Sequence, residues 1–142
     1  MKLLDRARRH LYQNYRQPDF VLAEGRGCEV FDTDGRRYLD LCAGIAVDTL
    51  GHAHPRLVSA ISAQAAKLMH VSNYFFNLPN VELAERLTQL TGYARALFCN
   101  SGTEAVEAAL KLARRHFSSR GQTDRYRVIA FKNSFHGRTM GA

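Results

Sequence analysis

A short turn in front of a helical pattern carries the clearest chemical signal in the sequence. Asn100-Ser-Gly-Thr103 follows the apolar run Ala96–Cys99 and precedes a long amphipathic segment. The first N–H groups of a helix lack intrahelical partners, and the helix dipole places partial positive charge there. Gly102 lets a ligand approach the backbone closely, while Ser101 and Thr103 can add hydroxyl donors. The turn therefore has the composition of a phosphate site at a helix N-terminus.

The same residues also fit a helix cap that binds no ligand. Ser101 and Glu104 have the S-x-x-E spacing of a capping box. Judged from this motif alone, a capped helix is the commoner case. The phosphate site is therefore a hypothesis that depends on what surrounds the turn.

A second group of chemically useful side chains lies in Phe131–Thr139, directly after the apolar run Arg127–Phe131. If both apolar runs are parallel strands, this segment follows a strand end, where ligands of open α/β sheets collect, and it lies near residues 101–103. Phe135 could cover a flat ring, and Arg138 could pair with a carboxylate through two hydrogen bonds. Taken singly, Phe135 fits a core position and Arg138 a surface position equally well.

The patterns around these segments predict an α/β fold. Apolar spacing favours helices over 55–70 and 80–91, with Gly92 as the C-cap of the second. A strand at 96–99, a long helix and a strand at 127–131 would form a βαβ crossover. One crossover is too little for a whole sheet, so the sequence is expected to be part of a larger fold.

The first third of the sequence predicts smaller elements. Apolar residues alternate on both sides of Asp34-Gly35, which favours a β-hairpin within Cys28–Cys42. The apolar positions between Leu3 and Leu11 suit a surface helix, and the absence of an unbroken apolar run argues against a secretory signal. An Arg-rich mitochondrial presequence is the alternative, which Asp5 disfavours.

Charge and composition limit the classes of partner. The net charge is +7, but the basic residues are dispersed, so a solvated surface is expected and nucleic-acid binding is not. No apolar run approaches the roughly 20 residues that cross a bilayer, so no membrane partner is expected. Cys28, Cys42 and Cys99 form no CxxC pair, which favours a reducing compartment and a cytoplasmic location.

The spacing of two histidines resembles that of metal ligands, but no metal site is expected. His52 and His54 form an H-x-H pair before Pro55, but no third ligand lies nearby in the sequence. The expectation is a role in structuring the loop, with no metal. His136 is likewise expected to support its loop.

In their order and spacing, these motifs resemble the class III (ornithine-type) aminotransferases, enzymes of fold type I that use pyridoxal 5'-phosphate (PLP). The similar segments, in sequence order, are Phe31–Gly35, Gly51–Pro55, Glu82–Glu85, Asn100–Ala105 with Ala108–Ala113, and Phe135–Thr139. The resemblance implies an incomplete fold. Residues 1–75 would be an N-terminal segment of the small domain, and residues 76–142 the start of the large PLP-binding domain.

The resemblance also implies a role for individual residues. Ser101, Gly102 and Thr103 would hold the PLP phosphate, Phe135 would stack on the pyridine ring, Arg138 would bind the substrate α-carboxylate, and Phe76 would line the substrate entrance. The family's Schiff-base lysine lies later in its sequences. No catalytic residue is therefore expected among Lys2, Lys67, Lys111 and Lys132, and this chain alone is expected to be inactive.

Within the family, Ile45–Val47, Leu50–Pro55 and Ala130–Arg138 most resemble members that transfer the amino group of N-acetylornithine to 2-oxoglutarate in arginine biosynthesis. The partners implied are a small amino donor and a 2-oxo acid, in a homodimer. Ornithine, succinylornithine or 4-aminobutyrate as the amino donor, and a non-catalytic remnant, are the alternatives.

Overall fold

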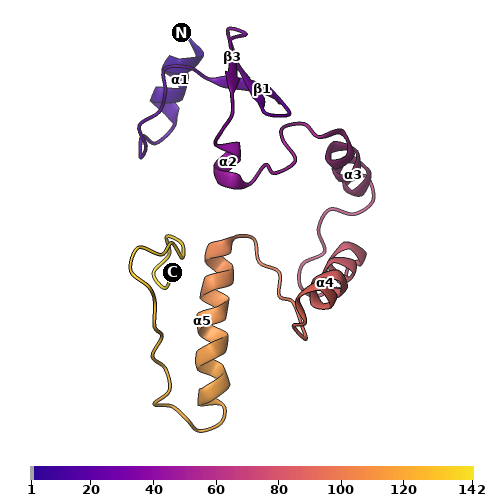
Figure 1. Ribbon diagram of the computed structural model, residues 1–142, viewed down its shortest axis with the longest axis vertical. Coiled ribbons are helices and arrows are strands. Elements are labelled where there is room, and N and C mark those ends of the chain that lie inside the picture. Colours follow the sequence, from indigo (N-terminus) through magenta and orange to yellow (C-terminus); the bar gives the residue numbers. More distant parts are fainter. Residues whose placement is uncertain (1) are drawn as a thin grey trace. The chain divides into compact units, whose positions relative to one another are not determined.

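A computed structural model describes residues 2–142 of the chain. It divides into two compact units, one ending at His70 and one beginning at Val71. The first unit holds six elements: α1 (Leu3–His10), β1 (Leu22–Arg26), β2 (Glu29–Asp32), β3 (Arg37–Leu39), α2 (Ala43–Ala46) and α3 (Pro55–Ala65) (Figure 1). The second unit holds α4 (Leu78–Thr91) and α5 (Gly102–Ser118).

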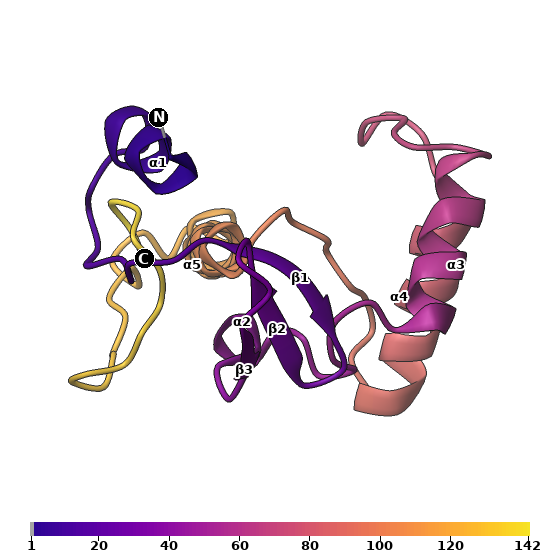
Figure 2. The same ribbon diagram turned by 90° about the horizontal axis from the view of Figure 1, so that it is seen from above.

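The first unit is built on a three-stranded antiparallel sheet in the order β1-β2-β3 (Figure 2). Gly25 pairs with Val30, which in turn pairs with Tyr38. The β2–β3 turn closes with a hydrogen bond from the Gly35 N–H to the Asp32 carbonyl at 3.0 Å, and Gly35 has φ +80°. The hairpin predicted around Asp34-Gly35 is therefore confirmed.

Asp32 is the best-satisfied polar group of this sheet. Its Oδ1 accepts the N–H groups of Asp34 and Arg36 at 2.9 Å, and its Oδ2 accepts the Tyr38 hydroxyl at 2.8 Å. Burial raises the pKa of this carboxyl, but the hydrogen bonds from Tyr38, Arg36 and Asp34 together hold the pKa below its ordinary value. Val30 and Asp32, two positions apart on β2, are both buried, and Asp32 is only 4% exposed.

The loop after the sheet is fixed to it by His52. The backbone of His52 exchanges two hydrogen bonds with Gly27, at 2.8 and 2.9 Å, and its Nε2 lies 2.7 Å from Asp40 Oδ2. Gly25 is required opposite this ring, because a Cβ there would lie 2.7 Å from the His52 ring carbon Cγ. The loop-structuring role expected of His52 is confirmed, while His54 Nδ1 is buried without a hydrogen-bond partner in the described chain.

Strand β1 was not predicted from the sequence. Leu22–Arg26 contains a central glycine and lacks the alternation that marks a strand. Its pairing with β2, together with the approach of His52, accounts for the glycine.

Helix α3 begins at Pro55 as predicted but is shorter, and α4 begins at Leu78, two residues before its predicted start. Pro55 lies in the first turn of α3, which ends at Ala65 and not at 70, so the predicted last turn is wrong. Here the Lys67 N–H bonds to the Gln64 carbonyl at 3.0 Å, and Met69 is 85% exposed, so no packing extends the helix. Helix α4 ends at Thr91, and Gly92 follows it with φ +74°, which confirms the predicted C-cap.

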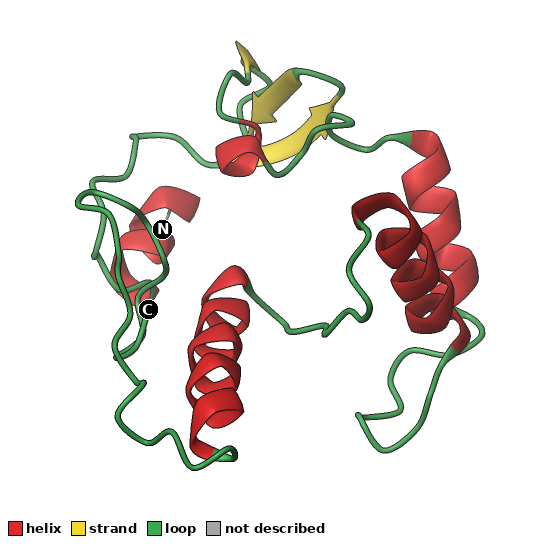
Figure 3. Cartoon of the chain, turned by 60° about the horizontal axis from the view of Figure 1, so that its bottom comes forward, coloured by secondary structure: helices red, strands yellow, loops and turns green. Residues whose placement is uncertain are grey.

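The strands predicted at 96–99 and 127–131 are absent from the described structure. Both runs are drawn as loop in Figure 3 and take no part in a ladder. A strand needs hydrogen bonds to a neighbour, and in residues 2–142 the structure offers these runs none. Their side chains are correspondingly exposed, at 66% for Leu97 and 94% for Ile129. The fold is mixed α/β and partial, without the predicted parallel crossover.

None of the helices in residues 2–142 is both long and apolar enough to cross a membrane. Within the same residues, no cluster of three or more His, Cys, Asp or Glu side chains is arranged to hold a metal ion.

Candidate functional site

Ser101 begins helix α5 as its N-cap. Its backbone is extended (φ −148°, ψ 161°), and its Oγ accepts the Glu104 N–H at 3.2 Å. The Ser101 carbonyl accepts the Ala105 N–H at 3.1 Å. Half of the predicted capping box is thus present. The Glu104 carboxylate lies 3.5 Å from the Ser101 hydroxyl rather than on the Ser101 N–H.

This cap leaves two backbone donors at the helix start. Among residues 2–142, the N–H groups of Gly102 and Thr103 have no hydrogen-bond partner, as is typical of the first helical turn. The space next to Gly102 is open, since a Cβ built there would meet no atom within 4 Å. The turn can therefore receive a phosphate without rearranging the helix.

The segment after residue 131 lies directly against this turn. A Cβ on Gly137, which has φ +137°, would lie 2.9 Å from Thr103 Cβ, so a side chain there is excluded. Phe135 is 78% exposed, and the Arg138 guanidinium carbon lies 6.0 Å from the centroid of its ring. The predicted approach of the Phe131–Thr139 segment to the 101–103 turn is present at Gly137 and Thr103, although the strands expected to produce it are not.

Glu107, one turn into α5, joins the helix to the same segment. Its Oε1 accepts the Thr139 hydroxyl at 2.6 Å and the Gly141 N–H at 3.1 Å. These two hydrogen bonds, from Thr139 first and then Gly141, lower the pKa of the carboxyl, with a smaller contribution from the charge of Lys111 and against a modest effect of burial.

Sequence reasoning missed this contact. The only partner that the helical spacing offers Glu107 is Lys111, four residues on, whose Nζ lies 3.8 Å away. The available signal was an acidic residue on α5 one turn after a predicted phosphate turn, and the sequence does not show what it would contact.

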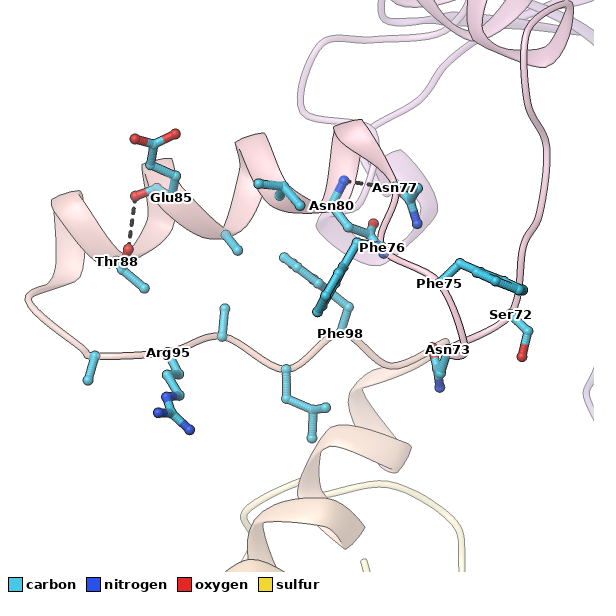
Figure 4. A pocket seen from close by; sticks show the side chains of 15 residues that line it. Ser72, Asn73, Phe75, Phe76, Asn77, Asn80, Glu85, Thr88, Arg95 and Phe98 are labelled. Atoms are coloured by element: carbon cyan, nitrogen blue, oxygen red, sulfur yellow. Dashed lines mark hydrogen bonds between the residues drawn. The ribbon is translucent and has the colours of Figure 1, made fainter.

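Phe76 lies in a different place from the other predicted site residues. It lines an open cavity of 640 Å³ between α4 and residues 94–98. Figure 4 shows Phe76 and Phe98 directed into this space and Asn77 at the start of α4. Neither the 101–103 turn nor Phe135 and Arg138 line the cavity. The structure thus does not bring Phe76 to the turn, and its role at a substrate entrance stays a prediction.

Comparison with known proteins agrees with these features. Residues 11–142 match the family "Aminotransferase class-III". The acetylornithine aminotransferase of Myxococcus xanthus is 55% identical over 138 residues, which cover 97% of this chain and 34% of that protein.

Solved structures give the same relationship. The N-acetylornithine aminotransferase of Stenotrophomonas maltophilia K279a matches 95% of this chain and 36% of its own, with a TM-score of 0.80 and 44% identity. The ornithine aminotransferase of Toxoplasma gondii ME49 matches 95% of this chain and 32% of its own, with a TM-score of 0.82 and 31% identity.

The chain spans about a third of the length of the relatives it matches. Its fold is accordingly part of the PLP-dependent transferase fold, in agreement with the sequence-based expectation. The family consists of PLP-dependent enzymes. By the match over residues 11–142 and the identity to its relatives, the chain belongs to the class III aminotransferases.

Proposed function

We propose that this chain is the phosphate- and carboxylate-binding part of a PLP-dependent aminotransferase. The observation that carries the proposal is the start of α5, where the N–H groups of two residues have no partner in the described part of the chain, the space beside Gly102 is open, and Gly137 of the later segment lies against Thr103. Gly137 thus brings the stretch that carries Phe135 and Arg138 to the turn, so residues for a phosphate, a ring and a carboxylate belong to segments in contact. The fit to PLP rests on this donor set.

Each residue contributes by binding or orientation. Gly102 and Thr103 would donate backbone N–H groups to the phosphate, and Ser101 would keep the turn open by capping the helix. Phe135 would cover one face of the ring. Arg138 would hold the substrate α-carboxylate through two parallel hydrogen bonds, which fixes the reacting carbon relative to the ring.

When bound, PLP supplies an electron sink for the carbanion that transamination requires. Residues 2–142 contribute positioning to that chemistry. No lysine among them is proposed as a catalytic group.

For the full-length protein, we propose transfer of the amino group of N-acetylornithine to 2-oxoglutarate. The support is the identity of 55% and 47% to acetylornithine aminotransferases of Myxococcus xanthus and Archaeoglobus fulgidus. Ornithine is the second candidate donor, since the ornithine aminotransferase of Toxoplasma gondii is structurally similar over the same residues.

A donor comparison tests this function. The full-length protein, loaded with PLP, is supplied with 2-oxoglutarate and one amino donor at a time, and glutamate formation is followed. We expect kcat/KM for N-acetylornithine to exceed that for ornithine and for 4-aminobutyrate by at least about tenfold, because a different donor end group leaves buried polar groups unpaired. A higher value for ornithine would replace the proposed substrate, and no glutamate with any donor would refute the aminotransferase function.

The remaining proposals concern organisation. We propose that residues 1–75 belong to the small domain and 76–142 to the large PLP-binding domain, which the unit boundary after His70 supports.

We also propose a cytoplasmic homodimer. The cysteine pattern supports the location, and the exposed apolar side chains of Leu41 and Val47 support an interface. Light scattering on the full-length protein should give twice the subunit mass, and a monomer would refute the dimer.

A further inference from the structure

We propose that Glu107 is a positioning residue that ties the segment carrying Phe135 and Arg138 to helix α5. Its carboxylate binds this segment immediately after Arg138, and this bond sets where the arginine stands relative to the phosphate turn. This inference rests on the proposed function for the role of Arg138, but the tie itself is a property of the chain.

The contacts fix the segment on both sides of Arg138. On one side, Gly137 packs against Thr103 so closely that a Cβ would be 2.9 Å from the threonine Cβ. On the other, the Thr139 hydroxyl donates to Glu107 Oε1 at 2.6 Å. The backbone of Arg138 is thus held between two neighbours that each contact α5 or its first turn.

Gly141 extends the tie by one more bond. Its N–H donates to Glu107 Oε1 at 3.1 Å, and a Cβ on Gly141 would lie 2.8 Å from Glu107 Oε2. Glycine at this position lets the backbone reach the carboxylate. The two bonds join residues that are 32 and 34 positions apart in sequence, so they determine tertiary and not local structure.

The ionised form of Glu107 is the one that these bonds need. A carboxylate only accepts hydrogen bonds, and those to a charged acceptor are roughly twice as strong as neutral ones. The side chain is 24% exposed, so solvent screens the interaction only in part. Lys111 lies farther away, at 3.8 Å, and is itself 78% exposed, so it is not needed for the tie.

Limited proteolysis of the full-length protein without PLP tests the tie. Trypsin should cut after Arg138 faster when the segment leaves the helix, because cleavage needs a locally opened chain. The rate at which the Arg138–Thr139 bond is cut, followed by mass spectrometry, therefore reports this opening. We expect Glu107→Gln and Thr139→Val to raise this rate about tenfold, because each weakens a charge-assisted hydrogen bond. Thr139→Ser, which keeps the hydroxyl, should be cut as slowly as the wild-type protein. The matched control Lys111→Gln should also leave the cleavage rate unchanged.

The kinetic arm tests positioning. With PLP bound, Glu107→Gln should raise KM for the amino donor about tenfold and change kcat much less, because a mobile Arg138 loses substrate binding. Thr139→Ser should retain the wild-type KM. A purely structural role would lower kcat through a smaller active fraction and leave KM unchanged.

The two arms separate the two proposals. If the protein shows no transaminase activity but cleavage rises in Glu107→Gln, the proposed function fails and the tie stands. Unchanged cleavage in Glu107→Gln would overturn the tie, and raised cleavage with unchanged KM would overturn the positioning role.

Discussion

The sheet unit and the α5 unit both use a carboxylate to close a turn or segment, but over very different distances in sequence. Asp32 accepts hydrogen bonds from residues two, four and six positions away and is 4% exposed. Glu107 accepts them from residues 32 and 34 positions away and is 24% exposed. The hairpin is thus defined by its own sequence, whereas the candidate site depends on a contact between distant segments.

Removing the local carboxylate should have the largest effect. Asp32→Ala leaves the N–H groups of Asp34 and Arg36 and the Tyr38 hydroxyl without their acceptor. We expect the amides of the hairpin to exchange about thirtyfold faster, because three hydrogen bonds to a charged acceptor are lost together. Hydrogen exchange of the β2 and β3 amides in the full-length protein measures it.

Asp34→Ala is the control for that variant. Asp34 is 74% exposed and lies 3.8 Å from Arg36, so its loss should change the same exchange rates little. Equal effects of the two substitutions would contradict the role given to Asp32.

The second largest effect is expected from a steric change at Gly137, where the later segment contacts Thr103 of α5. Gly137→Ala places a methyl group against Thr103, which should move the segment away from the turn and weaken PLP binding by about tenfold, as expected for a misplaced ring contact. PLP titration of the apo protein measures the change. Gly121→Ala tests whether backbone strain alone is responsible, since Gly121 has φ +76° in open space; equal loss there would contradict the account.

Acid should loosen both regions. The folded pKa values of Asp32, Asp40 and Glu107 lie below the ordinary 3.8 for Asp and 4.5 for Glu, so their contribution to stability is complete above those values. It is lost as the pH falls from the ordinary value through the lowered one. Hydrogen exchange at Gly141, corrected for intrinsic rates, should therefore accelerate below about pH 4.5, and Glu107→Gln should abolish this dependence. A dependence that survives in Glu107→Gln would assign it to another group.

The smallest expected effect is a gain in stability. Ala43–Ala46 runs through positive φ values, including +65° at Ile45, where a β-branched residue is strained. Ile45 is 84% exposed, so Ile45→Asn, which tolerates this conformation, should stabilise the sheet unit by about 1 kcal/mol. Thermal unfolding measures it, and a loss of stability would show that Ile45 is covered in the full-length protein.

The contrast between local and long-range contacts also explains which features the sequence could predict. The turn at Asp34-Gly35, the cap at Ser101 and the end of α4 at Gly92 follow from residues next to one another, and each was predicted. The runs 96–99 and 127–131 have the composition of strands, but a strand depends on a neighbour that the described chain does not place beside them. The contact of Glu107 with Thr139 depends on the path of the intervening chain, which local patterns do not determine.

Binding of the PLP phosphate by the start of α5 is the proposal on which the other site roles depend. It is tested most directly by the dissociation constants of PLP and of pyridoxal for the apo full-length protein and its Gly102→Asp variant. An aspartate in the first turn stabilises a helix and here meets open space, so the variant should fold, yet its charge repels a phosphate. We predict that the wild-type protein binds PLP at least about a hundredfold more tightly than pyridoxal, and that Gly102→Asp removes most of this preference. An unchanged preference in Gly102→Asp would contradict the account.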